Sequence, residues 1–259
     1  AERIRTVADL VRAALPRKPV VVASAHKGVT DMLIDLGHQA LKGAFSLEPL
    51  RERHLEIIRE LGLSPAIMEN LLDELSSLLQ GITMVKELTP RTKDYVCSFG
   101  ERLSVRTIAA YFVQAGIDAK AIDAYDLGLI TDSNFGNAQP LAEADQIMHW
   151  NIRRMTGVPV ITGYNGKDKN GDITTLGRNG SDYSGTIIGA AIDAEEVQIW
   201  TDVDGVMTAD PAVVPGAVPL ATMAFSEAGE LAYYGGRVLH PATLIPAIKK
   251  DIPVRVLNT

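Results

Sequence analysis

Residues 173–191 read I-T-T-L-G-R-N-G-S-D-Y-S-G-T-I-I-G-A-A, and this stretch carries the clearest local signal of the fold. Its first residues have the β-branched character of a buried strand, and a helix is predicted from Ser181 to Ala191. Gly177 and Gly180 between them allow backbone conformations that other residues resist. A strand, a glycine-rich turn and a helix in this order are typical of an α/β protein.

The glycine-rich turn is suited to binding an anion. Free N–H groups at a helix start favour negative charge. Arg178 adds a planar guanidinium that can hold a carboxylate through two hydrogen bonds. The same residues fit an ordinary turn in which Ser181 caps the helix equally well, so the local pattern leaves both interpretations open.

A second strand and turn cover residues 198–211, which read Q-I-W-T-D-V-D-G-V-M-T-A-D-P. The strand ends in Thr201 and Asp202, and D-G forms a turn. Ligands of open α/β sheets lie beyond the carboxyl ends of strands, where such polar groups can hold the ribose or phosphates of a nucleotide. A solvated turn explains the spacing as well.

Residues 20–31, V-V-V-A-S-A-H-K-G-V-T-D, form a third junction between a strand and a helix. Ser24 and Lys27 can contribute to a phosphate or carboxylate cradle, and Thr30 is a candidate N-cap. The segment lacks the full P-loop pattern G-x-x-x-x-G-K-S/T, so the usual P-loop is not supported. A surface charge is the simpler interpretation of Lys27.

A fourth segment, S-F-G-E-R-L-S at residues 98–104, lies inside a predicted helix. A helical glycine costs about 1 kcal/mol relative to alanine, which suggests that Gly100 lets another group approach Glu101 closely. The Glu101 carboxylate can then accept hydrogen bonds from an ammonium group. A solvent-facing glutamate paired with a nearby arginine is the more common arrangement and remains the alternative.

Elsewhere, apolar strand-like runs alternate with helical patterns, which predicts a mainly parallel α/β sheet. The polar stretch 167–171 contains N-G and predicts a hairpin. Strands are expected over residues 19–23, 119–130, 158–163, 173–176, 197–201 and 252–257. Helices are expected over residues 30–41, 47–80, 91–115, 225–234 and 241–249.

Composition excludes several protein classes. The 259 residues carry a net charge of -7, which argues against a general nucleic-acid surface. The one cysteine, Cys97, excludes an internal disulfide framework and a multi-cysteine metal site, and we interpret it as a small buried residue. No apolar run approaches the ~20 residues of a membrane helix, and no signal segment precedes the first strand. A cytoplasmic location is expected.

Taken together and in order, these segments resemble the aspartate kinases of the amino-acid kinase superfamily. The resemblance implies an α/β fold, a three-layer α/β/α sandwich with a mainly parallel central sheet. Aspartate would lie over an N-terminal lobe of about residues 1–163, and ATP over a C-terminal lobe of about residues 164–259. The motifs that carry the resemblance are S-A-H-K-G-V-T-D, D-Y-V-C-S-F-G-E-R-L-S, T-T-L-G-R-N-G-S-D-Y-S, I-W-T-D-V-D-G-V-M-T-A-D-P and V-L-H-P.

The resemblance also implies roles for the residues at matching positions. Arg178 would clamp the α-carboxylate of aspartate and Glu101 would bind its ammonium. Thr30 and Ser181 would add hydrogen bonds, and Tyr164 would lie beside the substrate. Two residues, Ser24 and Asp182, would lie near the transferring phosphate.

The nucleotide side is expected to use ATP with Mg²⁺ held mainly through the phosphates, without a dedicated protein metal site. The partners implied are aspartate and ATP, with no nucleic acid and no membrane, in a homo-oligomer that is expected to be a dimer. The positions expected to contact the nucleotide are Thr201, Asp202, Met207 and Arg237.

Several departures from the family pattern keep alternatives open. The usual opening K-F-G-G-T-S is absent from these residues, and no ACT regulatory domain is expected within them. Met207 stands where a tyrosine is usual, Ala212 where an arginine is usual, and Arg237 where a lysine is usual. A catalytically silent nucleotide- or amino-acid-binding module, or a kinase of another small carboxylate, therefore remains an alternative. Glu101 together with Arg178 favours an α-amino acid as the substrate.

Overall fold

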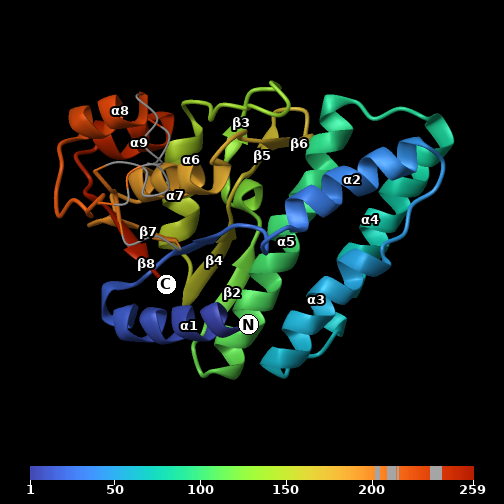
Figure 1. Ribbon diagram of the computed structural model, residues 1–259, viewed down its shortest axis with the longest axis horizontal. Helices are drawn as coiled ribbons and strands as arrows, with labels where there is room; N and C mark the ends of the chain where they lie inside the picture. Colours follow the sequence, from blue (N-terminus) through green and yellow to red (C-terminus); the bar gives the residue numbers. More distant parts are fainter. Residues whose placement is uncertain (202–204, 209–213, 215, 234–240) are drawn as a thin grey trace. The chain divides into compact units, whose positions relative to one another are not determined.

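The chain forms two compact units, Ala1–Ser181 and Asp182–Thr259. Figure 1 shows the elements of both units in the computed structural model. The predicted lobe boundary near residue 163 stays a prediction. The structure describes residues 1–201, 205–208, 214, 216–233 and 241–259.

The first unit contains a parallel three-stranded sheet in the order β1-β4-β2. Its strands are β1 (Val21–Ala23), β4 (Val158–Thr162) and β2 (Ala119–Ile122). The central strand β4 is buried at all its positions, as expected for a parallel strand covered on both faces. Ala23 pairs with Thr162 and Ile122 with Ile161. The carboxyl ends of the three strands therefore meet at one edge, where ligands of parallel sheets bind.

A second sheet in the same unit has the order β3-β5-β6. Its strands are β3 (Ile130–Thr131), β5 (Asn165–Asp168) and β6 (Ile173–Thr175). β3 and β5 are parallel, whereas β5 and β6 form an antiparallel hairpin. Asp168 closes the hairpin turn by accepting hydrogen bonds from the N–H groups of Asn170 and Asp172, both at 2.9 Å. The hairpin predicted around residues 167–171 is confirmed.

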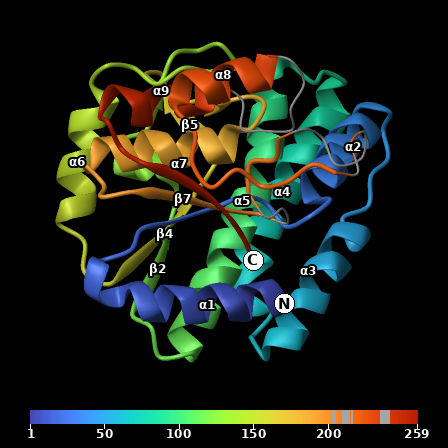
Figure 2. The same ribbon diagram turned by 60° about the vertical axis from the view of Figure 1, so that its left-hand side comes forward.

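Helix α5 (Pro90–Gln114) is the axis of the first unit. Figures 1 and 2 both show α2, α3 and α4 on one side of α5 and β2 on the other. Buried leucines of α2 and α4, such as Leu33 and Leu75, pack with Phe99 of α5. Phe112 packs with Val160 of β4 and with α1 in a second cluster. The other helices are α1 (Glu2–Ala14), α2 (Val29–Leu41), α3 (Glu48–Leu61), α4 (Ala66–Val85) and α6 (Ala144–Arg153), with short 3₁₀ turns η1 (Leu15–Arg17) and η2 (Ala124–Leu127).

The second unit has a smaller core between one parallel strand pair and its helices. A Cβ atom on Gly189 would lie 2.5 Å from Val197 Cγ2, so the small residues of α7 permit close packing on β7. Ala190, Val197, Ile199, Ala247 and Ile252 form the buried cluster. The elements described are α7 (Gly180–Ala191), β7 (Val197–Thr201), α8 (Phe225–Tyr233), α9 (Pro241–Lys249) and β8 (Val254–Asn258).

Three sequence-based expectations about these elements are wrong. The predicted helix over residues 47–80 is two helices, because the chain turns at Gly62 in a left-handed conformation (φ 69°) before Pro65. The predicted strand over residues 119–130 ends at Ile122 and continues as η2. Thr30 is not an N-cap, because α2 begins at Val29 after Gly28, whose φ is 82°.

None of the described helices combines the length and apolarity needed to cross a bilayer.

Candidate functional site

One face of α5 forms the base of the candidate site. Asp94, Ser98 and Glu101 are spaced four and three residues apart, so they lie on the same side of the helix, and all three are buried. A Cβ atom on Gly100 would lie 2.8 Å from Ala25 Cβ, too close for any residue but glycine. Gly100 therefore lets the segment after β1 contact α5 directly beside Glu101, as the sequence suggested.

The Glu101 side chain is buried and only partly paired. It is 3% exposed, and Oε1 accepts a hydrogen bond from the Ala25 N–H at 3.1 Å. Oε2 is buried without a hydrogen-bond partner among the described residues. Burial raises the pKa of Glu101 to about 8, because a carboxylate loses its hydration in the interior. The alternative of a solvent-facing glutamate is wrong, and the unpaired oxygen is suited to a cationic donor.

The glycine-rich turn approaches the same region from the end of β6. Gly177 has φ 78° and Asn179 has φ 55°, so both lie in the left-handed region. Gly180 serves a different purpose from the predicted one, because it is needed for space: a Cβ atom there would lie 2.4 Å from Tyr164 Cδ2. Arg178 between them extends an exposed side chain.

Tyr164 and Ser181 lie together at this turn. A Cβ atom on Gly163 would lie 2.7 Å from Ser181 Cβ, and the Tyr164 carbonyl accepts from the Leu176 N–H at 2.9 Å. Burial raises the pKa of the Tyr164 hydroxyl, and negative charge at Asp94 and Glu101 adds to the shift. The ring of Tyr164 therefore shares its surroundings with the carboxylate of Glu101.

Asp94 is the residue of this region that the sequence reasoning missed. Its carboxylate is 3% exposed and accepts three hydrogen bonds: from Gly136 N–H at 2.8 Å, from Thr175 N–H at 2.8 Å and from Thr175 Oγ1 at 2.9 Å. The only sequence signal was its position seven residues before Glu101, on the same helical face. Asp94 joins α5 to the 131–138 loop and to β6.

The remaining predicted positions of the first unit lie between the end of β1 and the first turn of α2. Ser24 is exposed and follows β1 directly, at the carboxyl edge of the parallel sheet. Thr30 is half-buried in the first turn of α2.

The structure describes three of the predicted positions in the second unit, two of them at element ends. Asp182 is half-buried in the first turn of α7, and burial raises its pKa. Thr201 ends β7, and its carbonyl accepts from the Thr259 N–H at 3.0 Å. Met207 is half-buried and forms a bridge with Pro219. Asp202 and Arg237 lie outside the described residues.

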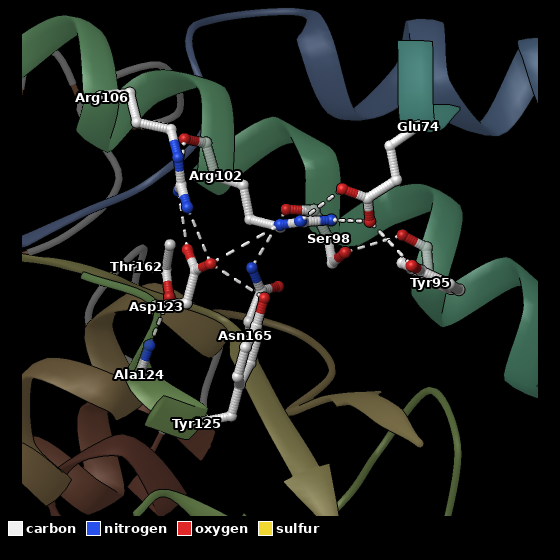
Figure 3. Close-up of polar contacts among 10 residues, drawn as sticks. All are labelled: Glu74, Tyr95, Ser98, Arg102, Arg106, Asp123, Ala124, Tyr125, Thr162 and Asn165. Carbon is white, nitrogen blue, oxygen red and sulfur yellow. Dashed lines mark hydrogen bonds and ion pairs between the residues drawn. The ribbon is translucent and has the colours of Figure 1, made fainter. Parts of the chain in front are cut away.

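A network of arginines and carboxylates holds α5 in place beside the site (Figure 3). Arg102 donates to both oxygens of Glu74 at 2.9 and 2.8 Å and lies 4.6 Å from the Phe99 ring centroid. Arg106 donates to both oxygens of Asp123, at 2.8 and 2.9 Å, at the end of β2. The network ties α4, α5 and β2 together, so the backbone that carries Glu101 is fixed from both sides.

The described part of the chain shows neither a dedicated metal centre nor a reactive thiol. Within the described ranges, no three His, Cys, Asp or Glu side chains are grouped so that they could hold an ion. Cys97 is buried, as expected, and burial raises the pKa of its thiol to about 12. His26 and His54 lie with ring centroids 5.5 Å apart, and burial lowers the pKa of His26 to about 3.

Comparison with known proteins finds relatives over the whole chain. Residues 1–258 match the model of the Amino acid kinase family. Aspartokinase 1, chloroplastic, from Arabidopsis thaliana is 42% identical over 276 residues, which cover 100% of this chain and 48% of that protein. Lysine-sensitive aspartokinase 3 from Escherichia coli is 37% identical over 92% of this chain and 54% of that protein. The chain therefore spans about half the length of these relatives.

Solved structures also match almost the whole chain, among them two aspartate kinases. Aspartokinase III from Escherichia coli in complex with aspartate and ADP has a TM-score of 0.77 and 29% identity over 99% of this chain and 58% of that one. The aspartate kinase of Clostridium acetobutylicum has a TM-score of 0.81 and 25% identity over 99% of this chain and 56% of that one. These matches confirm the predicted fold class.

The buried ion network predicts a large effect on stability. Asp123→Asn removes the charge that faces Arg106 and Arg102, so the free energy of unfolding should fall by about 3 kcal/mol. Glu143→Gln is the matched control, because its partner Lys169 forms an exposed ion pair that contributes little. Urea denaturation of both variants measures the difference, and equal stabilities would contradict this role of the network.

The pKa of Glu101 predicts a pH-dependent effect of its removal. Its pKa is about 8 in the folded chain, whereas an exposed glutamate has a pKa of about 4.3. The folded state therefore binds more protons between these pH values, and the stability of the wild type falls as pH rises. Glu101→Gln lacks this loss, so its stability relative to the wild type should increase from pH 5 to pH 8. Denaturation curves at both pH values test this, and a difference independent of pH would contradict it.

Proposed function

Because the chain belongs to the amino acid kinase family, we propose that it is the catalytic part of an aspartate kinase. The enzyme transfers the γ-phosphoryl group of ATP to the side-chain carboxylate of L-aspartate and forms 4-phospho-L-aspartate, the first step toward lysine, threonine and methionine. The observation that carries the proposal is the buried, half-paired carboxylate of Glu101. Its charge acts on Tyr164, against which Gly180 of the Arg178 turn packs.

The amino-acid substrate is proposed to bind through its charges at Cα. Its ammonium group binds Glu101, which loses its proton because a nearby cation favours the charged form. Its α-carboxylate binds the Arg178 guanidinium, whose fork matches a carboxylate. Thr30 and Ser181 add hydrogen bonds, and Tyr164 covers the substrate. Recognition of both groups distinguishes an α-amino acid from a simple carboxylate.

The chemical step needs positioning and neutralisation of charge more than covalent help. A β-carboxylate oxygen of aspartate attacks the γ-phosphorus, and the bond from that phosphorus to the β–γ bridging oxygen breaks to release ADP. The nucleophile is already an anion, so no general base is required. Ser24 and Asp182 are proposed to lie near the transferring group. Thr201, Asp202, Met207 and Arg237 are proposed to contact the nucleotide.

Mg²⁺ is proposed to accompany ATP. Because no three candidate ligands are grouped in the described part of the chain, the ion would be held chiefly by the phosphates, as is usual for Mg²⁺ with one or two carboxylates. The bound ion neutralises phosphate charge. A homodimer is part of the same proposal.

A coupled ADP-release assay on the full-length protein tests the proposed function. Turnover should depend on L-aspartate, ATP and Mg²⁺ together. Turnover with a different small carboxylate but without aspartate would support the related-kinase alternative. Calorimetric binding of both ligands without ADP release would support a catalytically silent binding module.

Substitution of Glu101 should act mainly on the amino-acid substrate. Glu101→Gln should raise the KM for aspartate between about tenfold and a hundredfold, because a hydrogen bond to a charged group contributes ~1.5–3 kcal/mol and each 1.4 kcal/mol is about tenfold. The KM for ATP should stay within about twofold. Glu143→Gln, on the exposed surface, serves as the control, and an unchanged KM for aspartate in Glu101→Gln would refute this role.

A further inference from the structure

We infer that Asp94 is a positioning residue for the amino-acid substrate, because it fixes from inside the protein the turn that carries Arg178. The inference rests on the proposed function, and it concerns a residue that does not itself reach the substrate. Asp94 lies at the start of α5, and both of its carboxylate oxygens are occupied by the protein.

Asp94 holds the end of the strand that leads into the Arg178 turn. Asp94 accepts from the Thr175 N–H at 2.8 Å and from the Thr175 hydroxyl at 2.9 Å. Thr175 is the last residue of β6 and is fully buried. The next residue, Leu176, is also buried and its N–H donates to the Tyr164 carbonyl at 2.9 Å, and the Gly180 N–H donates to the Gly177 carbonyl at 3.1 Å. The chain therefore enters the Arg178 turn from fixed backbone.

The loop behind the turn is held by the same carboxylate. Asp94 also accepts from the Gly136 N–H at 2.8 Å, and the Ala138 N–H donates to the Thr175 carbonyl at 2.9 Å. A Cβ atom on Gly177 would lie 2.8 Å from Asn137 Oδ1 and 3.0 Å from the Gly136 carbonyl oxygen. The loop therefore packs directly on Gly177, so one carboxylate holds both the turn and its support.

Helix α5 connects these contacts of Asp94 to the Glu101 carboxylate. Asp94 and Glu101 are two helical turns apart on the same face of α5. Glu101 is proposed to hold the substrate ammonium, and the turn held by Asp94 carries the guanidinium proposed to hold the α-carboxylate. α5 thereby sets the spacing between the two groups that recognise an amino acid. A misplacement of about 1 Å in such a site can cost on the order of a hundredfold in rate.

The hydrogen bonds of Asp94 predict which variants at positions 94 and 175 should keep the affinity for aspartate. Asp94→Ala removes all three acceptor contacts. Asp94→Asn can preserve them, because its amide oxygen can accept from both backbone N–H groups while its NH₂ donates to the Thr175 hydroxyl, which also accepts. Thr175→Val removes only the hydroxyl contact, whereas Thr175→Ser keeps it.

The test measures L-aspartate binding by calorimetry, and steady-state kinetics, for these four variants of the full-length protein. Asp94→Ala should weaken aspartate binding and raise its KM by about tenfold or more, with the KM for ATP within about twofold. Asp94→Asn and Thr175→Ser should recover most of the wild-type affinity, and Thr175→Val should lose about threefold. If Asp94→Ala does not fold, the comparison of Thr175→Val with Thr175→Ser decides.

A matched control separates positioning from general loss of stability. Thr83→Val also removes a hydroxyl contact between two elements, the hydrogen bond from Thr83 to the Ala40 carbonyl, but it is part of neither the Arg178 turn nor the network that holds Glu101. It should therefore lower stability without changing aspartate affinity. An equal loss of affinity in Thr83→Val, or none in a folded Asp94→Ala, would overturn the inference alone. Absence of aspartate binding in the wild type would overturn the proposed function as well. Amide hydrogen exchange at Gly136 and Thr175 should rise in Asp94→Ala whichever substrate is used.

Discussion

Desolvation of the Glu101 carboxylate is the constraint on which the rest of the site depends. A buried charge is costly unless it is paired and hydrogen-bonded. Among the residues that the structure describes, only Ala25 donates a hydrogen bond to one oxygen of Glu101, and the other oxygen is unpaired. The chain accepts this arrangement because the neighbouring elements enforce it. Gly100 admits the segment after β1 to within contact of α5, and the Arg102 and Arg106 network fixes the helix on the other side. The free protein is therefore poised to bind a cation at this point.

Much of the architecture could be predicted because it follows from local rules. Strand β7 and helix α9 have the predicted bounds, since apolar alternation and a proline at the helix start are sequence-local signals. The importance of Gly100 was also readable, because a glycine inside a helix has a cost that packing must offset. The close approach of Ala25 is that compensation.

Other features depend on tertiary contacts that no local pattern reveals. Strand β5 reads N-G-K-D and has no β-branched residue, so only its pairing with β3 and β6 makes it a strand. Asp94 looks like any polar residue of a long helix until its partners Gly136 and Thr175, 42 and 81 residues away, are known. Gly180 was expected to supply backbone freedom, but what it supplies is room for Tyr164.

The central claim is that Glu101 is protonated in the free protein at pH 7 and ionises when it receives an ammonium group. Infrared difference spectroscopy of the wild type and Glu101→Gln, recorded on addition of L-aspartate at pH 7, observes this change directly. The wild type should lose a protonated-carboxyl C=O band, and Glu101→Gln should show no such loss, whereas the carboxylate bands of L-aspartate itself appear in both spectra. A wild-type spectrum without this loss, although aspartate binds, would contradict the account.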